Sequence, residues 1–173
     1  INTLCYSYQI VYAIVALVKK PKKVEAKKLH KYGVLISARN ESTVIGNLID
    51  SIKAQNYPSH LVDIFVVADN CTDDTAAIAR KHGAIVYERF NTEKVGKGYA
   101  LDYLLKIINS IYSYKGYEGY FVFDADNVLD PNFIRAMNAQ FDQGYKVLTC
   151  YRNSKNYGTN WISAGYALWF LHR

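Results

Sequence analysis

Apolar and polar residues alternate in blocks along the chain, and these blocks predict strands and helices in turn. Short runs rich in apolar and β-branched residues predict strands at 33–37, 62–68, 84–88, 120–123 and 146–151. Apolar residues at helical spacing predict helices over about 42–55, 73–81, 99–111 and 130–141. Strands that are apolar throughout and joined by helices are typical of a mainly parallel sheet covered on both faces. The predicted fold class is therefore α/β.

The residues at the predicted helix ends support these limits. Ser42 could cap the first helix, and Pro58 follows its end. Asp73 and Asp74 suit the positive N-terminus of the second helix, which Gly83 ends. Both helices therefore begin in the loop that directly follows a predicted strand.

The first 31 residues hold an apolar run and the whole net charge of the chain. Residues 10–18 are all apolar, and residues 19–31 hold seven lysines against one acid, a local excess equal to the net charge of +6 of the whole chain. A nucleic-acid binder more often spreads its positive charge over a folded face, so we expect no nucleic-acid partner. Lysines beside an apolar segment mark its cytoplasmic side and attract anionic lipid head groups.

This pattern predicts a membrane protein with its folded domain on the cytoplasmic side of the cell membrane. Residues 1–18 would be the end of a transmembrane or membrane-surface helix, and residues 19–31 a basic juxtamembrane linker. A span needs about 20 apolar residues, so this stretch falls short alone, and residues upstream of Ile1 could complete it. An ordinary buried helix remains an alternative.

The remaining composition fits one intracellular domain. A length of 173 residues is enough for a single domain with a real core. Three cysteines at unrelated spacings offer neither a disulfide framework nor a zinc site, which favours a reducing compartment.

Polar residues follow three of the predicted strands. Asn40 and Glu41 come after the first, Asp69 ends the second, and Asp124 and Asp126 follow the run 120–123. In a parallel sheet the carboxyl ends of the strands meet at one edge, where ligands bind. We therefore expect Glu41, Asp69 and Asp126 to line one common pocket.

The Asp-x-Asp pair is the candidate metal site. A strand directs residues i and i+2 to the same side, so Asp124 and Asp126 can converge on one ligand. Hard oxygen ligands suit Mg²⁺ or Mn²⁺, which typically take one or two protein carboxylates and complete their shell with phosphates and water. The alternative is a turn in which Asp126 and Asn127 hydrogen-bond their own backbone.

Four motifs together resemble a known family. No Gly-x-Gly-x-x-Gly follows the first strand, which disfavours a dinucleotide-binding enzyme, and no P-loop occurs that could bind a nucleoside triphosphate. The motifs are Ile-Ser-Ala-Arg-Asn-Glu at 36–41, Asp-Asn-Cys-Thr-Asp-Asp-Thr at 69–75, Gly-Lys-Gly at 96–98 and Phe-Asp-Ala-Asp-Asn at 123–127. In order and spacing, they resemble the donor half of a family 2 inverting glycosyltransferase with a GT-A fold. The resemblance implies a nucleotide-sugar-binding domain at 32–151 and the start of an acceptor-side region at 152–173.

The resemblance also implies roles for single residues. Ala38, Arg39, Asn40 and Glu41 would line the nucleoside pocket. Asp69 would accept a hydrogen bond from the base, Lys97 would lie near the base or diphosphate, Asp124 would face the ribose or sugar, and Asp126 would bind the metal, with Asp124 as a second ligand. Each has a structural alternative: Glu41 at a helix N-terminus, Asp69 in a turn and Lys97 as a solvated lysine.

The expected activity is metal-dependent transfer of a sugar, N-acetylglucosamine or glucose, from a UDP-sugar to a polysaccharide or glycolipid acceptor with inversion. The family places its general base well beyond the Asp-x-Asp pair, and this sequence has no acid after Asp142. We therefore expect the base beyond Arg173 and feeble turnover, at best, from these 173 residues. Two alternatives remain: a non-catalytic nucleotide- or protein-binding module, and a phosphotransfer or hydrolase domain with Asp124 as nucleophile.

Overall fold

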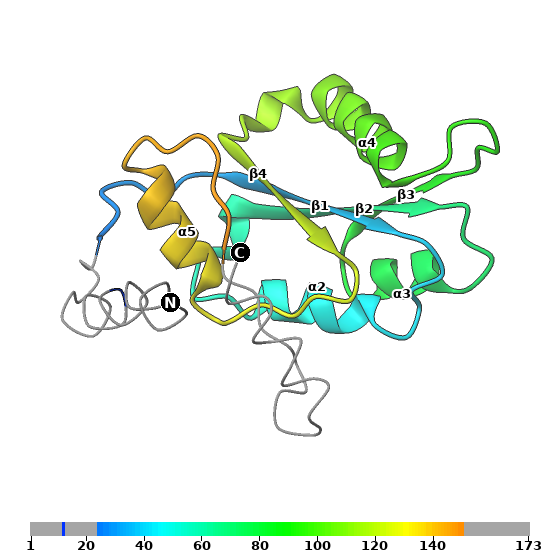
Figure 1. The fold of residues 1–173 in the computed structure, drawn as a ribbon, viewed down its shortest axis with the longest axis horizontal. Helices are drawn as coiled ribbons and strands as arrows, with labels where there is room; N and C mark the ends of the chain where they lie inside the picture. Colours follow the sequence, from blue (N-terminus) through cyan, green and yellow to red (C-terminus); the bar gives the residue numbers. More distant parts are fainter. Residues whose placement is uncertain (1–11, 13–23, 151–173) are drawn as a thin grey trace, which may run out of the picture.

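The computed structural model describes residue 12 and residues 24–150, which form an α/β fold with a wholly parallel sheet. Within residues 24–150 the four strands are β1 (Tyr32–Ala38), β2 (Val62–Asp69), β3 (Ile85–Arg89) and β4 (Gly119–Asp124). Their order in the sheet is β3-β2-β1-β4 (Figure 1). The predicted fold class is thus confirmed. The predictions for residues 1–11, 13–23 and 151–173 lie outside the described residues.

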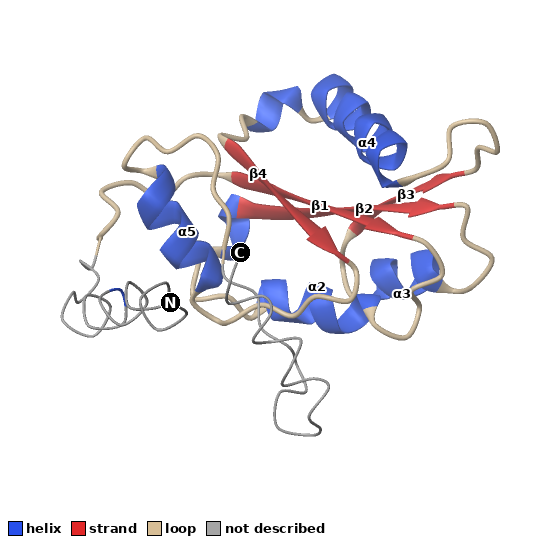
Figure 2. Cartoon of the chain, in the orientation of Figure 1, coloured by secondary structure: helices blue, strands red, loops and turns tan. Residues whose placement is uncertain are grey.

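Helices cover both faces of the sheet. In the segment 24–150 the helices are α2 (Ile45–Lys53), α3 (Thr75–Lys81), α4 (Lys97–Ile111) and α5 (Phe133–Phe141), with short 3₁₀ turns η1 (Ser59–Leu61) and η2 (Ser113–Lys115). Figure 2 shows α4 on one side of the strands and α2, α3 and α5 on the other. None of the helices in the part of the chain that the structure describes is long and apolar enough to span a bilayer.

The strand residues alternate between two apolar cores. Val34 and Ile36 of β1 pack with α2 and α5, whereas Leu35 packs with Leu104 and Ile108 of α4. Burial of both faces explains why the strands are apolar throughout, since each fully buried aliphatic side chain contributes about 1.5–3 kcal/mol.

The parallel register brings the carboxyl ends of the strands to one edge, which we call the rim. Ser37 pairs with Asp124, Ala38 with Ala68, and Asp69 with Arg89. Helix α4 runs back across the sheet, so its N-terminus lies towards the same edge (Figure 1). The fold therefore places the loops after β1, β2 and β4 and the start of α4 close to one another.

Two local predictions are wrong. Helix α2 begins at Ile45 without a side-chain cap, and the Ser42 amide instead donates to Asp73 Oδ2 at 3.2 Å. Residues 146–150 form no strand, and Val147 is 92% exposed. Apolar character alone does not make a strand, because a strand also needs a hydrogen-bonded neighbour. Among the described strands, β4 pairs with β1 and none pairs with 146–150.

Candidate functional site

The loop after β1 supplies four of the predicted site residues. Ala38 is buried at the end of the strand, Arg39 and Asn40 are exposed, and Glu41 is half-buried. Asn40 adopts the left-handed conformation with φ 56°, which asparagine tolerates better than most residues. The backbone therefore turns sharply at Asn40 before α2 begins.

Hydrogen bonds tie this loop to the loop after β2. The side-chain oxygen of Asn40 accepts a bond from the Thr72 amide at 2.8 Å. The Glu41 amide donates to Thr75 Oγ1 at 2.8 Å. Asp73 accepts bonds from Thr75, through its hydroxyl and its amide, and from the Ser42 amide, and these bonds lower the pKa of Asp73 to about 2. The Asn40 side chain therefore has a structural role that sequence reasoning did not predict.

Asp69 forms a buried ion pair at the centre of the rim. Its carboxylate oxygen Oδ1 accepts a hydrogen bond from Arg89 Nη1, and the two side chains are only 5% and 8% exposed. The second guanidinium nitrogen of Arg89 donates to the Lys94 carbonyl at 2.5 Å. Arg89 thus connects β2 with the loop that leads to α4. Sequence reasoning missed Arg89, although its position at the end of the third strand would have placed it at the rim.

Lys97 and Asp124 form a second ion pair, nearer to the solvent. Lys97 Nζ contacts Asp124 Oδ1, and both side chains are 46% exposed. Lys97 is the first residue of α4, two residues before the predicted helix start, and Asp124 is the last residue of β4. The structure thus brings together two residues that lie 27 positions apart in the sequence.

The segment after β4 is a tight turn. The Asn127 amide donates to the Asp124 carbonyl at 3.0 Å, and the Asp124 amide donates to Asn127 Oδ1 at 3.3 Å. Asp126 is exposed in this turn, and its carboxylate accepts a bond from the Asn127 side chain at 3.2 Å. The alternative prediction, a turn closed by side-chain bonds to the backbone, is therefore confirmed for Asn127. Asp124 and Asp126 remain accessible at the rim.

The chemistry of these two carboxylates fits a hard divalent cation. Asp124 and Asp126 offer oxygen ligands at an exposed edge, and Mg²⁺ or Mn²⁺ needs only one or two of them when phosphates and water fill the shell. Within 24–150 no group of three or more His, Cys, Asp or Glu side chains could hold a metal alone. A cation here would therefore complete its shell with water or with the phosphates of a substrate.

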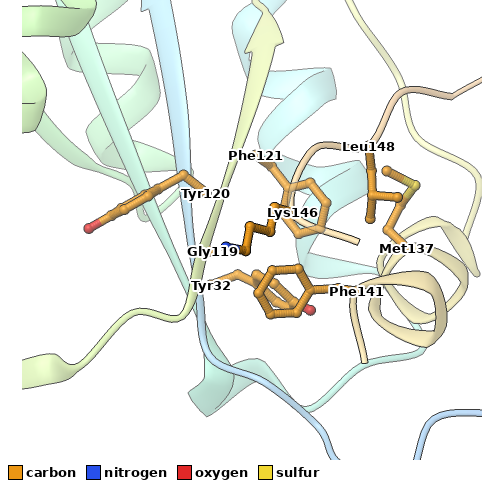
Figure 3. A pocket seen from close by; sticks show the side chains of 8 residues that line it. All are labelled: Tyr32, Gly119, Tyr120, Phe121, Met137, Phe141, Lys146 and Leu148. Atoms are coloured by element: carbon orange, nitrogen blue, oxygen red, sulfur yellow. The ribbon is translucent and has the colours of Figure 1, made fainter. Parts of the chain in front are cut away.

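Two hollows of the structure lie away from the rim. Figure 3 shows the first, where the rings of Tyr32, Phe121 and Phe141 surround a space near the start of β4. The second lies beside Tyr57 and the start of β2. Neither hollow contains a predicted site residue. A common pocket lined by Glu41, Asp69 and Asp126 stays a prediction.

Comparison with protein families gives a match over most of the chain. The model of a family described as "Glycosyltransferase like family 2" matches residues 30–173. A curated relative, 4,4'-diaponeurosporenoate glycosyltransferase of Staphylococcus aureus strain MRSA252, is 46% identical over 55 residues. That match covers 32% of this chain and 14% of the relative.

Solved structures share the fold. A mannosyltransferase from Pyrobaculum calidifontis, in complex with GDP-Man and Mn²⁺, matches 79% of this chain with a TM-score of 0.57 and 22% identity. Residues 1–349 of TarS from S. aureus, in complex with UDP-GlcNAc, match 65% of this chain with a TM-score of 0.52 and 23% identity. The chain spans 41% and 31% of these two proteins, respectively.

Proposed function

The chain belongs to glycosyltransferase family 2, and we propose that it is the donor-binding domain of an inverting enzyme that uses a UDP-sugar and a divalent metal. The observation that carries the proposal is the placement of Asp69, Asp124 and Lys97 on one rim of a parallel sheet. The rim would supply both carboxylates for a metal and a cation for a diphosphate.

The solved neighbours support a sugar nucleotide as the ligand. One was solved with GDP-Man and Mn²⁺, and another with UDP-GlcNAc. We propose a UDP-sugar carrying N-acetylglucosamine or glucose as the donor, and Mn²⁺ or Mg²⁺ as the cofactor. A polysaccharide or glycolipid would be the acceptor.

Each rim residue would contact a different part of the donor. Asp69 would accept a hydrogen bond from the base through Oδ2, because Oδ1 binds Arg89. The loop of Ala38, Arg39, Asn40 and Glu41 would border the nucleoside, and Asp124 the ribose or sugar. When bound at Asp126 with Asp124 as a second ligand, the cation would neutralise the charge that develops on the departing diphosphate.

Inversion requires an acceptor hydroxyl to attack the anomeric carbon from the face opposite the diphosphate, while a general base takes its proton. No acid follows Asp142 in this sequence, and Asp142 itself bonds His30 at 3.0 Å. We therefore propose that the 173 residues bind donor but transfer sugar feebly at best, with the base supplied by residues beyond Arg173.

The proposal includes a location at the cell membrane, with this domain on the cytoplasmic side. Its support is the lysine-rich segment 19–31 directly after the apolar residues 10–18. Two residues of this segment contact the folded domain: the Lys27 backbone amide donates to Asp142 Oδ2, and Lys28 Nζ donates to Glu118 Oε2.

Calorimetric titration of UDP and GDP, each with Mn²⁺ or with EDTA, tests the proposal. We expect UDP to bind more tightly than GDP and only with Mn²⁺, and we expect Asp126→Ala to lose this Mn²⁺-dependent binding. Absence of any nucleotide binding would contradict the proposal and favour a non-catalytic protein-binding module. Rapid sugar transfer by the purified chain would contradict the proposed location of the base.

A further inference from the structure

We propose that Lys97 is an internal counter-ion of the metal site, which neutralises Asp124 in the empty rim and moves to the diphosphate when metal and nucleotide bind. This inference rests on the proposed function. Its consequence is that the affinity for the cation and the affinity for the nucleotide are coupled through the Lys97 side chain.

The first observation is the contact itself. Lys97 Nζ lies against Asp124 Oδ1, one of the two carboxylates that fit a divalent cation. An ammonium and a divalent cation at the same carboxylate oxygen repel each other, so the cation must displace Lys97 or bind less tightly. Both side chains are 46% exposed, so Lys97 can leave Asp124 without unpacking the core.

The position of Lys97 in its helix supports a functional role. A positive side chain in the first turn of a helix is opposed by the helix dipole, and the first turn of α4 contains no acidic residue to compensate. Asp124 of β4 supplies the missing negative charge from outside the helix. A lysine placed against its helix dipole and paired with a candidate metal ligand breaks a local rule, as functional residues often do.

The surroundings of Lys97 leave room for an anion. Gly96 has φ 125°, which favours glycine, and a Cβ added at Gly96 or Gly98 would meet no heavy atom within 4 Å. The N-terminus of the 15-residue helix α4 directs backbone amides towards this open space. A diphosphate here would give Lys97 a new anionic partner once the cation has taken Asp124.

Metal and nucleotide would then assist each other. Binding of the cation frees Lys97 for the diphosphate, and binding of the diphosphate removes Lys97 from Asp124. Such coupling is reciprocal, since each ligand changes the affinity of the other by the same factor. The size of the coupling is limited by the strength of the exposed pair between Lys97 and Asp124. A pair of this kind can change the affinity for the metal alone by up to about fivefold.

The test is Lys97→Met, with Lys106→Met as the matched control. Lys106 lies on the same helix and forms the same kind of exposed pair, with Asp102 at 2.7 Å. We expect Lys97→Met to bind free Mn²⁺, measured by the electron paramagnetic resonance signal of unbound Mn²⁺, about two- to fivefold more tightly than the unchanged chain. We expect the same variant to bind UDP in saturating Mn²⁺ at least about threefold more weakly. Lys106→Met should change neither affinity.

These opposite signs separate the proposal from a structural role, which would weaken both affinities or leave both unchanged. Unchanged or weaker Mn²⁺ binding by Lys97→Met would overturn the inference, as would unchanged UDP binding. If the unchanged chain binds Mn²⁺ and UDP normally in that case, the proposed function stands without this inference. If it binds neither, both fail.

Discussion

Replacing Arg89 should destabilise the domain far more than replacing an exposed arginine. Arg89→Met would leave the Asp69 carboxylate buried and unpaired, because the two side chains are only 8% and 5% exposed. Removing one partner of a buried ion pair typically costs about 3–5 kcal/mol. This is a large fraction of the about 5–15 kcal/mol by which a typical domain is stable.

Urea unfolding followed by circular dichroism measures this cost. With a slope of about 2 kcal/mol per molar urea, the midpoint of unfolding should fall by about 1.5–2.5 M. The matched control is Arg80→Met, whose pair with Glu88 at 2.7 Å has side chains 50% and 42% exposed. Since exposed pairs contribute about 0–1 kcal/mol, its midpoint should fall by less than about 0.5 M.

A second substitution tests the reason for the loss. Asp69→Asn added to Arg89→Met removes the uncompensated charge, so the double variant should recover at least about half of the lost stability. A midpoint for Arg89→Met equal to that of Arg80→Met would refute the reasoning, as would a double variant no more stable than Arg89→Met. Because Asp69 also stabilises the fold, Asp126→Ala is the cleaner test of ligand binding.

Two further predictions concern polar groups outside the ion pairs of the rim. Hydrogen bonds from Lys28 and His30 lower the pKa of Glu118 to about 2, so the stability that Glu118 contributes is present above about pH 4.5 and lost as pH falls to about 2. In urea unfolding at stepped pH, Glu118→Gln should therefore reduce the loss of stability between about pH 4.5 and 2. An unchanged loss over this pH range would contradict the assignment. Asn40→Gly keeps the left-handed backbone but removes the hydrogen bond that the Thr72 amide donates to the Asn40 side chain. We therefore expect the free energy of unfolding to fall by about 1 kcal/mol and the Thr72 amide hydrogen to exchange faster. Unchanged exchange would show that the bond does not hold the loop.

The alternation of apolar runs was sufficient to predict the sheet and its rim. The strands of the central sheet are buried on both faces, so their sequences are apolar throughout, and parallel pairing then determines which ends meet. The positions of Asp69 and Asp124 at one edge follow from this alone. Local capping was less predictable, since Ser42 bonds Asp73 of another loop instead of its own helix.

The partners of the site residues could not be predicted from the sequence. Arg89 reaches Asp69 across 20 positions because β3 pairs with β2, and Lys97 reaches Asp124 across 27 positions because α4 begins beside the carboxyl end of β4. The predicted strand at 146–151 is wrong over its described residues because β-propensity does not report whether a neighbouring strand is available.

We propose above all that the rim binds a nucleoside diphosphate with a cation at Asp126. Anomalous diffraction from crystals grown with UDP and Mn²⁺ tests it most directly, because the signal locates the metal. We expect one Mn²⁺ peak about 2.0–2.2 Å from an Asp126 oxygen, next to the diphosphate. A peak elsewhere, or UDP bound in the hollow beside Tyr32 and Phe141, would contradict it.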